Sequence, residues 1–344
     1  MKTYENILKE LHDTPLTWLV SGAAGFIGSN LLLALLKAGQ RVVGIDNLST
    51  GHLYNIAEVR DIVSPSQWEN FTWIEGDVTD PDACERACSG VDVVLHHAAL
   101  GSVPRSIKQP DIITHNNVTG FVTLLMKCKD AGVKRFVYAS SSAVYGNDVN
   151  IPKVEIRTGE CLSPYAVSKK VNELYASVFK SCFGIDCIGL RYFNVFGPRQ
   201  DQHGMYAAVI PRWIDAMLHN DDITINGDGE TSRDFCYVAN VIQANILAAT
   251  VRDTLAMNTV YNISVGGRTS LNELIIMLKN RLIIHNSKFS VKSVIYKEFR
   301  AGDVRHSNAD INKAKRMLGY QPTHQIDVGL DECLDWYLSH SVTS

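Results

Sequence analysis

The chain has 344 residues, of which 46% are hydrophobic, and its formal net charge is -3 at pH 7. This length and apolar content are enough to bury the core of one large domain or two intimate ones. The slight negative charge argues against nucleic acid or an anionic membrane as the main partner. The eight cysteines form no C-x-x-C pair, which argues against a bound metal. Scattered free thiols are typical of a reducing, cytoplasmic environment.

The first 13 residues carry charges throughout and lack the apolar core of a signal peptide. Tyr4, Ile7 and Leu11 recur at helical spacing, so we expect an amphipathic helix over residues 3–12 that packs on the protein body. The longest apolar run, residues 31–36, is too short to span a bilayer. We therefore expect a protein that does not engage a membrane.

A glycine turn follows the first predicted strand, and a helical pattern follows the turn. Gly22 allows a tight turn, Gly25 lets a pyrophosphate approach the backbone, and Gly28 lets the helix pack on the strand. Free N–H groups at the start of the helix favour an anion. Asp46 ends the next predicted strand, where a carboxylate would hold the ribose of NAD. These residues predict a site for NAD; three loop glycines on an unrelated turn are the alternative.

Apolar strands alternate with helical patterns from residue 17 to residue 191. This alternation predicts an α/β protein with a Rossmann-like, doubly wound parallel sheet and a ligand crevice at the carboxyl ends of the strands. The predicted strands cover residues 17–21, 41–46, 70–75, 91–96, 135–140 and 186–191, and the main helices between them cover residues 110–131 and 164–183.

Beyond residue 191 the loops lengthen and the alternation stops. Helical patterns there cover residues 206–219, 238–250, 270–281, 310–318 and 325–339. We expect a smaller, mixed α/β lobe that binds substrate and closes over the crevice. The predicted NAD-binding domain comprises residues 1–190 and about 234–264, and the predicted substrate lobe comprises about 191–233 and 265–344.

Tyr165 and Lys169 are the first candidates for catalysis. Ser163 can cap a helix that begins at Pro164, and residues four apart then share one helix face. A free tyrosine has a pKa of about 10, and a nearby cation favours its phenolate form. Lowering that pKa by ~3 units takes roughly 4 kcal/mol, which Lys169 and a positive nicotinamide ring could supply together. An ordinary surface pair is the alternative, because Y-x-x-x-K is common.

Three serines directly follow the predicted strand at residues 135–140. A hydroxyl at the carboxyl end of such a strand faces the crevice. Ser141 could therefore bind a substrate oxygen and relay its proton to Tyr165, with Ser142 beside it. A turn built of small residues is the alternative interpretation.

Taken together, the motifs resemble those of an extended short-chain dehydrogenase/reductase. They are the glycine triplet, Asp46, GDVTD with Asp77, His97-Ala98-Ala99, Ser141, Tyr165-x-x-x-Lys169 and RYFNVFGP at residues 191–198. Within that family the chain resembles the nucleotide-sugar 4-epimerases, and most closely those acting on UDP-N-acetylhexosamines in bacterial surface-polysaccharide synthesis. Residues 101–106, 226–238 and 300–307 fit that group, so the resemblance covers nearly the whole chain.

The resemblance implies a tightly bound NAD, a UDP-sugar substrate and a homodimer assembled through helices 110–131 and 164–183. The implied catalytic residues are Tyr165, Lys169, Ser141 and Ser142. The implied cofactor residues are Gly22, Gly25, Phe26, Ile27, Gly28, Asp46, Asn47, Ser49, Thr50, Gly51, Asp77, Val78, Ala98, Ala99, Gly101, Tyr165, Lys169, Tyr192 and Val195. The implied substrate residues are Ser102, Arg105, Ser141, Ser142, Asn194, Ala208, Val209, Trp213, Thr224, Asn226, Arg233, Arg300, Asp303 and Ser307.

The implied reaction is C4 epimerisation. Tyr165 phenolate would take the proton of the sugar 4-OH while C4 gives hydride to NAD, and the tethered ketone would turn over before the hydride returns. There is no net oxidation, so NAD would stay bound. Small Ser307 leaves room for a 2-acetamido group, and Ser102 with Arg105 could reach C6. The substrate is therefore UDP-GlcNAc/UDP-GalNAc or the corresponding pair of uronic acids.

Five alternatives remain beside this interpretation. UDP-glucose/galactose 4-epimerisation differs from it only in the sugar. A 4,6-dehydratase would need a carboxylate where this chain has Ser141-Ser142-Ala143, and a decarboxylase acting on UDP-glucuronate is similarly disfavoured. A reductase releasing NADPH product would prefer a basic group at Asp46. A non-enzymatic NAD-sensing protein would have no need for Tyr165, Lys169 and Ser141 together.

Overall fold

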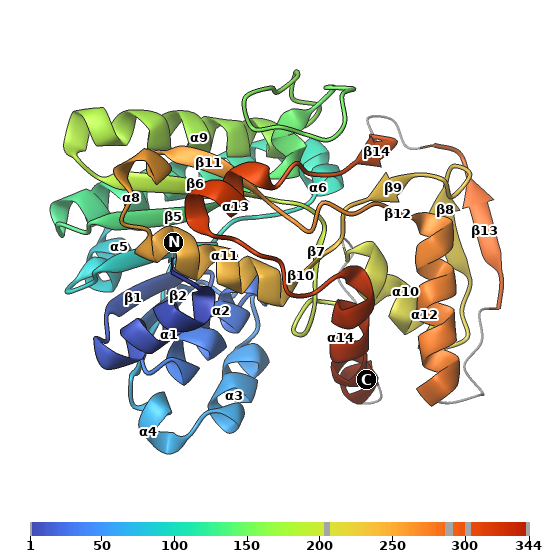
Figure 1. The fold of residues 1–344 in the computed structure, drawn as a ribbon, viewed down its shortest axis with the longest axis horizontal. Helices are drawn as coiled ribbons and strands as arrows, with labels where there is room; N and C mark the ends of the chain where they lie inside the picture. Colours follow the sequence, from blue (N-terminus) through green and yellow to red (C-terminus); the bar gives the residue numbers. More distant parts are fainter. Residues whose placement is uncertain (1, 203–206, 286–291, 300–303, 342–344) are drawn as a thin grey trace.

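A seven-stranded, fully parallel sheet forms the centre of the protein (Figure 1). The computed structural model describes residues 2–202, 207–285, 292–299 and 304–341. The strand order is β11-β6-β5-β4-β1-β2-β3, which confirms the predicted doubly wound α/β class. The strands are β1 (Thr17–Ser21), β2 (Arg41–Asp46), β3 (Phe71–Glu75), β4 (Val93–His96), β5 (Arg135–Ser141), β6 (Asp186–Tyr192) and β11 (Thr259–Ile263).

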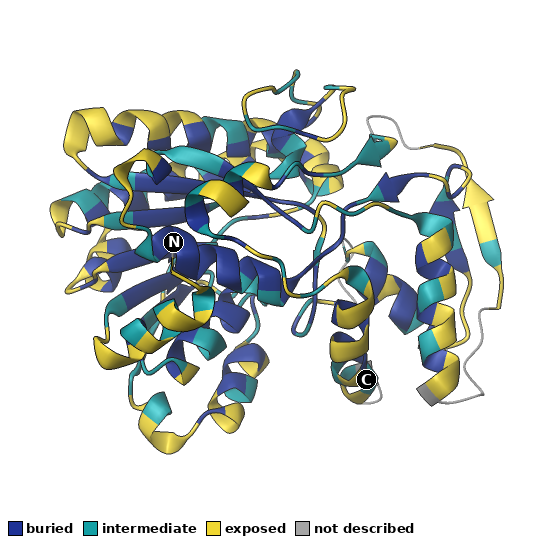
Figure 2. Ribbon diagram, in the orientation of Figure 1, coloured by how far each residue is buried: buried dark blue, intermediate teal, exposed yellow. Residues whose placement is uncertain are grey.

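Helices cover both faces of this sheet, and two apolar cores lie beneath them (Figures 1 and 2). Successive strand residues point to opposite faces, so Trp18 and Val20 enter one core and Leu19 enters the other. Burial on both faces explains why the strands read as continuous apolar runs. The first core packs against α1 (Tyr4–Asp13), α2 (Phe26–Lys37), α3 (Leu53–Ile62) and α11 (Val238–Thr250), and the second against α5 (Pro81–Cys88), α8 (Gly120–Asp130) and α9 (Pro164–Phe183).

The predicted helix over residues 164–183 is confirmed at both ends. The Ser163 hydroxyl accepts a hydrogen bond from the N–H of Ala166, and Pro164 occupies the first turn. Gly184 ends the helix in the left-handed region, with φ of +80°. This helix carries Tyr165 and Lys169, so its start fixes where they lie.

The helical stretch predicted over residues 110–131 is confirmed, but it contains a wider turn that the pattern did not predict. Helix α7 (Pro110–Thr114) leads into a π-helical turn, η1 (His115–Thr119), before α8 begins. Buried Asn117 accepts from the Leu100 N–H at 2.8 Å and donates to the Leu100 carbonyl and the Ser168 hydroxyl. Asn117 makes these contacts to other elements from within the wider π turn. Such bulges in helices occur frequently at functional sites. Helix α6 (Val103–Lys108) packs beside α7 and α9, whereas α4 (Pro65–Trp68) packs on α2.

A smaller lobe of helices and short strands packs around a third core, formed by residues such as Ile210, Ile214 and Leu274 (Figure 1). Its predicted helices are confirmed within a few residues. Its elements are β7 (Val195–Phe196), α10 (Val209–Leu218), β8 (Ile223–Asn226), β9 (Ser232–Arg233), β10 (Cys236–Tyr237), β12 (Thr269–Ser270), α12 (Leu271–His285), β13 (Val294–Lys297), β14 (His306–Ser307) and α14 (Ile326–Ser341). Helix α13 (Asn312–Leu318) packs instead on the first core beside β11.

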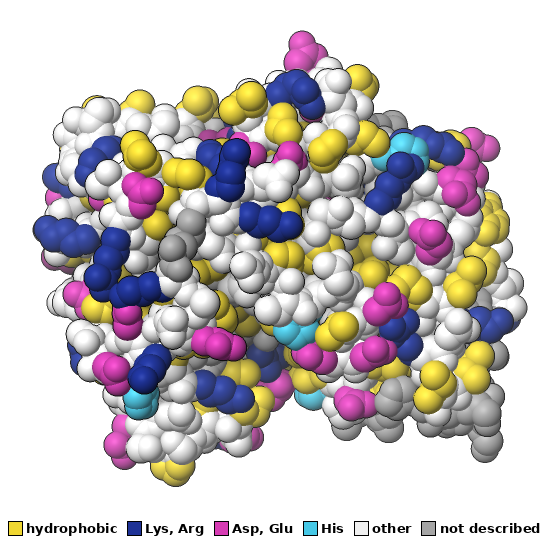
Figure 3. All heavy atoms as spheres, in the orientation of Figure 1, with side chains coloured by type: hydrophobic (Ala, Val, Ile, Leu, Met, Phe, Trp, Pro, Cys, Tyr) yellow, Lys and Arg dark blue, Asp and Glu magenta, His cyan; other side chains and the backbone are white. Residues whose placement is uncertain are grey.

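The surface carries both signs of charge, and the face in Figure 3 shows acidic and basic side chains interspersed with apolar ones. All eight cysteines are free. In the part of the chain that the structure describes, no helix is long and apolar enough to cross a membrane. Within the same described residues, no three His, Cys, Asp or Glu side chains are grouped so that they could hold a metal ion.

Candidate active site

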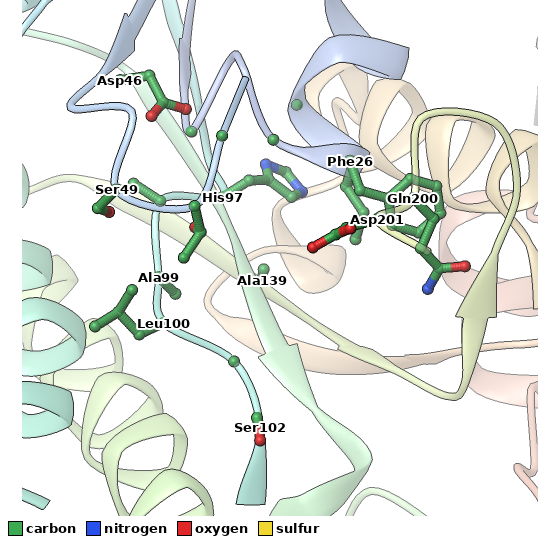
Figure 4. Close-up of a pocket in the computed structure, with 18 of the residues that line it drawn as sticks. Phe26, Asp46, Ser49, His97, Ala99, Leu100, Ser102, Ala139, Gln200 and Asp201 are labelled. Carbon is green, nitrogen blue, oxygen red and sulfur yellow. The ribbon is translucent and has the colours of Figure 1, made fainter. Parts of the chain in front are cut away.

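A cavity of about 720 Å³ opens at the carboxyl ends of the central strands, next to the smaller lobe (Figure 4). It extends from Asp46 and Ser49 past His97 to Ser102, as the close-up shows. Every residue predicted for the cofactor lines it, except Asp77. Of the residues predicted for the substrate, Ser102, Arg105, Ser141, Asn194 and Ala208 line it.

The glycine turn between β1 and α2 is packed backbone against backbone. A Cβ atom at Gly22, whose φ is +72°, would lie 2.8 Å from the Ala98 nitrogen. A Cβ atom at Gly28 would lie only 2.0 Å from the Gly22 carbonyl oxygen. Gly25 caps α2 without a side chain, so the first N–H groups of the helix are left for another acceptor. This cradle fits the pyrophosphate of a dinucleotide.

Asp46 reaches from the end of β2 to the glycine turn. Its carboxylate accepts hydrogen bonds from the N–H of Ala24 at 3.0 Å and the N–H of Leu48 at 2.8 Å. Burial raises the pKa of Asp46, and these two N–H groups oppose that rise. A carboxylate has about four acceptor positions, so capacity remains for ribose hydroxyls. The turn and Asp46 together therefore fit NAD.

Asp77 lies outside the cavity wall and acts on it through Asn47. Its carboxylate accepts from the side-chain amide of Asn47 at 2.6 Å and from the N–H and hydroxyl of Thr79. Burial raises the pKa of Asp77, but these hydrogen bonds outweigh burial and hold it below its usual value. Asn47 does line the cavity, so Asp77 fixes a lining side chain.

The three main catalytic candidates meet on one wall of the cavity. Ser141 ends β5, whereas Tyr165 and Lys169 lie in the first two turns of α9. The Lys169 ammonium donates a hydrogen bond of 2.9 Å to the carbonyl of Ala139. Its side chain is almost fully buried, and burial lowers the pKa of Lys169 to about 8. Ser142 lies beside them but does not line the cavity; it begins a 3-10 turn, η2 (Ser142–Tyr145).

In the chain by itself the Tyr165 pKa is raised, and the joint lowering expected from Lys169 and a nicotinamide ring stays a prediction. Burial raises the pKa of this phenol, and the hydrogen bond with Ser141 only opposes the rise. Desolvation dominates because the phenolate would lose its hydration inside the wall. A positive charge bound in the cavity would act in the lowering direction.

A second cavity, of about 280 Å³, adjoins the first and shares Asn194 and Ala208 with it. It lies within the smaller lobe, and its wall includes Val209, Trp213, Thr224, Asn226 and Arg233, all predicted substrate residues.

The other predicted substrate residues do not line this second cavity. Ser307 lies in β14, paired with Arg233 of β9, and lines neither cavity. Arg300 and Asp303 lie outside the described residues.

Residues 18–264 match the NAD dependent epimerase/dehydratase family. The chain belongs to this family. As a member it is an NAD-dependent enzyme, in agreement with the cradle and the catalytic wall described above.

Relatives of this epimerase/dehydratase family member cover nearly its whole length. A putative UDP-glucose 4-epimerase of Methanocaldococcus jannaschii is 35% identical over 94% of this chain and 99% of its own. The structure of a UDP-N-acetylglucosamine 4-epimerase from Methanobrevibacter ruminantium is 38% identical, with a TM-score of 0.85 over 95% of this chain and 99% of its own. A UDP-glucuronic acid 4-epimerase from Bacillus cereus, solved with UDP-glucuronic acid and NAD, is 31% identical, with a TM-score of 0.83 over 94% and 100% of the two chains.

Sequence reasoning missed several cavity residues of this family member. Arg199, Gln200 and Asp201 also line the cavity, and Gln200 and Asp201 are labelled with Phe26 in the close-up (Figure 4). The signal was their position directly after the RYFNVFGP motif. His52 follows the predicted Gly51 and also lines the cavity, but a single loop histidine carries no pattern of its own.

The buried ammonium of Lys169 predicts a pH-dependent stability for this family member. Its folded pKa of about 8 lies below the ordinary 10.5, so between these values the unfolded chain holds a proton that the folded chain lacks. Stability should therefore rise as pH increases through this window, by roughly 3 kcal/mol in total. Urea unfolding from pH 7 to 10 should show this rise for the wild type relative to Lys169→Met. Lys170→Met is the control, and parallel curves for the wild type and Lys169→Met would contradict the assignment.

Proposed function

We propose that this enzyme is a UDP-sugar 4-epimerase that acts on a UDP-N-acetylhexosamine, either UDP-GlcNAc/UDP-GalNAc or the corresponding uronic acids. The observation that carries the proposal is the meeting of Ser141, Tyr165 and Lys169 on one wall of a cavity that begins at the glycine turn. The adjoining second cavity, with Arg233 in its wall, supports a substrate that carries a diphosphate. The UDP-sugar 4-epimerases among the relatives support the reaction class.

In this mechanism the residues that would hold NAD are those of the glycine turn, with Asp46 and Asn47. The chemistry that NAD supplies when bound is reversible hydride transfer at the sugar C4. Tyr165 acts as the general base that takes the proton of the 4-hydroxyl, and Ser141 hydrogen-bonds both this phenol and the same sugar oxygen. Lys169, held by the Ala139 carbonyl, keeps its ammonium beside the reacting groups.

The UDP half stays fixed while the sugar turns over in the cavity. Asn194 belongs to both cavities, so it lies where the sugar and nucleotide parts of a single ligand would join. The Arg233 guanidinium donates to the carbonyls of Ser232 and Arg305, which fixes its orientation in the cavity wall. We assign Asn194, Arg233 and Arg300 to the diphosphate and the Asp303 carboxylate to the ribose hydroxyls of the UDP half; Arg300 and Asp303 lie outside the described residues.

A 4,6-dehydratase is disfavoured by the acids available at the site. Among the described residues of the larger cavity, the carboxylates are Asp46 and Asp201. Asp46 is bonded to the glycine turn, and Asp201 lies away from Ser141 in the sequence. Neither belongs to the segment Ser141-Ser142-Ala143, where an acid for elimination would be required.

The test is to incubate the purified enzyme with UDP-GlcNAc, UDP-GlcNAcA, UDP-Glc and UDP-GlcA in turn and to separate the products by chromatography. We expect inversion at C4 for the acetylated sugars without added NAD, and nucleotide in the supernatant after denaturation. A strong preference for UDP-Glc would remove the substrate assignment. No inversion of any sugar, even with NAD added, would overturn the proposed reaction.

The size of residue 307 provides a test of the acetamido pocket. Ser307 itself lines neither cavity but pairs with Arg233 of the second cavity wall, so a tyrosine ring at this position could extend into the space of the acetamido group. Ser307→Tyr should therefore lower kcat/KM for UDP-GlcNAc by about tenfold or more and leave UDP-Glc turnover much less affected. Thr269→Tyr is the matched control, since Thr269 pairs with Arg233 from the opposite side of β9. Equal losses on both sugars, or no loss on UDP-GlcNAc, would count against the pocket.

We also propose that the enzyme is a homodimer assembled through α9 and the helices beside it. Val167, Leu174 and Val178 form an exposed apolar stripe on α9, and exposed Ile107 lies on the neighbouring α6. Light scattering should give twice the mass of one chain, and Leu174→Glu should reduce it to one. Exposed Ile276 of α12 provides the control variant Ile276→Glu, which should leave the mass unchanged.

A further inference from the structure

Three successive turns of α9 contact the end of strand β5. Tyr165, Lys169 and Glu173 recur every fourth residue and therefore share one helix face. Tyr165 is hydrogen-bonded to the Ser141 side chain, and Lys169 donates to the Ala139 carbonyl. Glu173 forms the third contact one turn further on, away from the cavity wall. The proposed mechanism uses the first two contacts and leaves the third without a role.

The third contact is a buried ion pair that joins three elements. Glu173 accepts from the hydroxyl of Ser140 at 2.6 Å and from Nε and Nη2 of Arg191, each at 2.8 Å. All three side chains are buried. The remaining nitrogen of Arg191 donates to the Glu155 carbonyl, and its guanidinium lies 4.9 Å from the centre of the Tyr145 ring. A buried pair in which all three Arg191 nitrogens and both Glu173 oxygens are hydrogen-bonded favours one arrangement of the helix against the sheet.

We propose that Glu173 and Arg191 are a positioning pair that sets the height and rotation of α9 against β5, and thereby places Tyr165 and Lys169. Ser140 and Arg191 are direct neighbours across β5 and β6, so Glu173 is tied to both strands at one level. A slip of one residue along a helix moves a side chain by about 1.5 Å and rotates it by about 100°. A misplacement of about 1 Å at a reacting group can cost about 100-fold in rate. The inference rests on the proposed function of Tyr165.

The pair also keeps the surroundings of Tyr165 electrically balanced. Glu173 lies about 12 Å from Tyr165 along the helix axis. An uncompensated charge at that distance shifts a pKa by about one unit at an effective dielectric constant of about 20. Arg191 without Glu173 would favour the phenolate and lower the Tyr165 pKa, whereas Glu173 without Arg191 would raise it.

Few other titratable groups face this set. Burial keeps the pKa of both histidines at the end of β4 below the ordinary value, so they stay neutral across the neutral range. Lys170 lies 3.8 Å from Glu173 at the helix surface. The titratable groups that interact with Lys169, Glu173 or Arg191 include His96, His97, Tyr138, Tyr145, Cys161, Lys170 and Lys313.

The test measures kcat/KM against pH for Glu173→Gln, Arg191→Met and the double variant. We expect the acid limb, which reports the base, to move down by about one pH unit in Glu173→Gln and up by about one unit in Arg191→Met. The double variant should return near the wild-type limb with a lower kcat. Lys180→Met is the control, because the Lys180–Asp186 pair joins α9 and β6 at their other ends. Acid limbs that stay in place, or that move in the same direction, would overturn the proposal.

If Glu173→Gln and Arg191→Met fail to fold, Ser140→Ala provides a second test of the positioning pair. It removes only the hydroxyl that ties β5 to Glu173, so kcat should fall about tenfold with KM for the UDP-sugar and the melting temperature little changed. Ser177→Ala, on the exposed part of the same helix, should behave as wild type. An unchanged kcat in Ser140→Ala contradicts positioning. Tyr165→Phe, measured in the same assay, distinguishes failure of the proposed function from failure of the positioning role. An active Tyr165→Phe variant would overturn the proposed function. An inactive Tyr165→Phe variant beside unaffected Ser140, Glu173 and Arg191 variants would overturn only the positioning role.

Discussion

Replacing Tyr165 with Phe should lower kcat by roughly 1,000-fold while NAD stays bound. Phenylalanine keeps the ring and its packing but removes the oxygen that takes the proton from the sugar 4-hydroxyl. General-base catalysis contributes about 100- to 10,000-fold in enzymes, and the other wall residues remain in place. The loss should appear in kcat much more than in KM, because the missing interaction develops in the transition state.

The measurement is steady-state epimerisation of the best UDP-sugar, together with the nucleotide released on denaturation. Tyr175→Phe is the matched control, since Tyr175 lies on the same helix with an exposed side chain. The control should retain full activity. A Tyr165→Phe variant with near wild-type kcat would contradict the proposed role of this residue. If the variant instead lost its bound nucleotide, the fall in kcat would reflect cofactor loss and would contradict the expected result.

Gly28→Ala should weaken NAD retention by roughly 10- to 100-fold, although alanine is the better helix former. The new Cβ atom would lie 2.0 Å from the Gly22 carbonyl oxygen, so the turn or the helix must shift. Overpacking of this kind costs about 1–3 kcal/mol. Alanine in a helix interior gains only about 1 kcal/mol over glycine, so the clash prevails and distorts the cradle.

The measurement is the amount of NAD that co-purifies with each variant, with thermal unfolding as a second readout. Gly267→Ala is the control, because its Cβ atom would lie 3.2 Å from a Val265 methyl and 4.0 Å from Asp234 Oδ1, with no backbone atom among its neighbours. We expect the control to retain the nucleotide. Wild-type NAD content in Gly28→Ala would show that the close packing of this turn does not govern cofactor binding.

The local features of this protein followed from its sequence. The glycine spacing at residues 22–28 predicted a strand, a turn and a helix, and each lies where expected. Ser163 and Pro164 determine where α9 begins, so residues close in sequence place Tyr165 in its first turn. The fold class followed as well, because a run of buried strands between helices is satisfied by a parallel sheet covered on both faces.

Only the tertiary structure decided how distant segments complete the site. The π-helical turn at residues 115–119 interrupts a pattern that reads as one helix, because Asn117 bonds to Leu100 and Ser168. Strand β11 was not predicted, because the short run at residues 259–263 is identified as a strand only by its pairing with β6. The Tyr165 pKa is set by burial, which no spacing of residues reveals.

The division has one physical reason. Caps, turns and helix faces depend on residues a few positions apart, so the spacing of residues in the sequence predicts them. The ion pair between Glu173 and Arg191 joins residues 18 positions apart on different elements, and its geometry depends on a packed core. Desolvation and contacts between distant residues arise only when the whole chain folds, and they determine the electrostatics of the cavity.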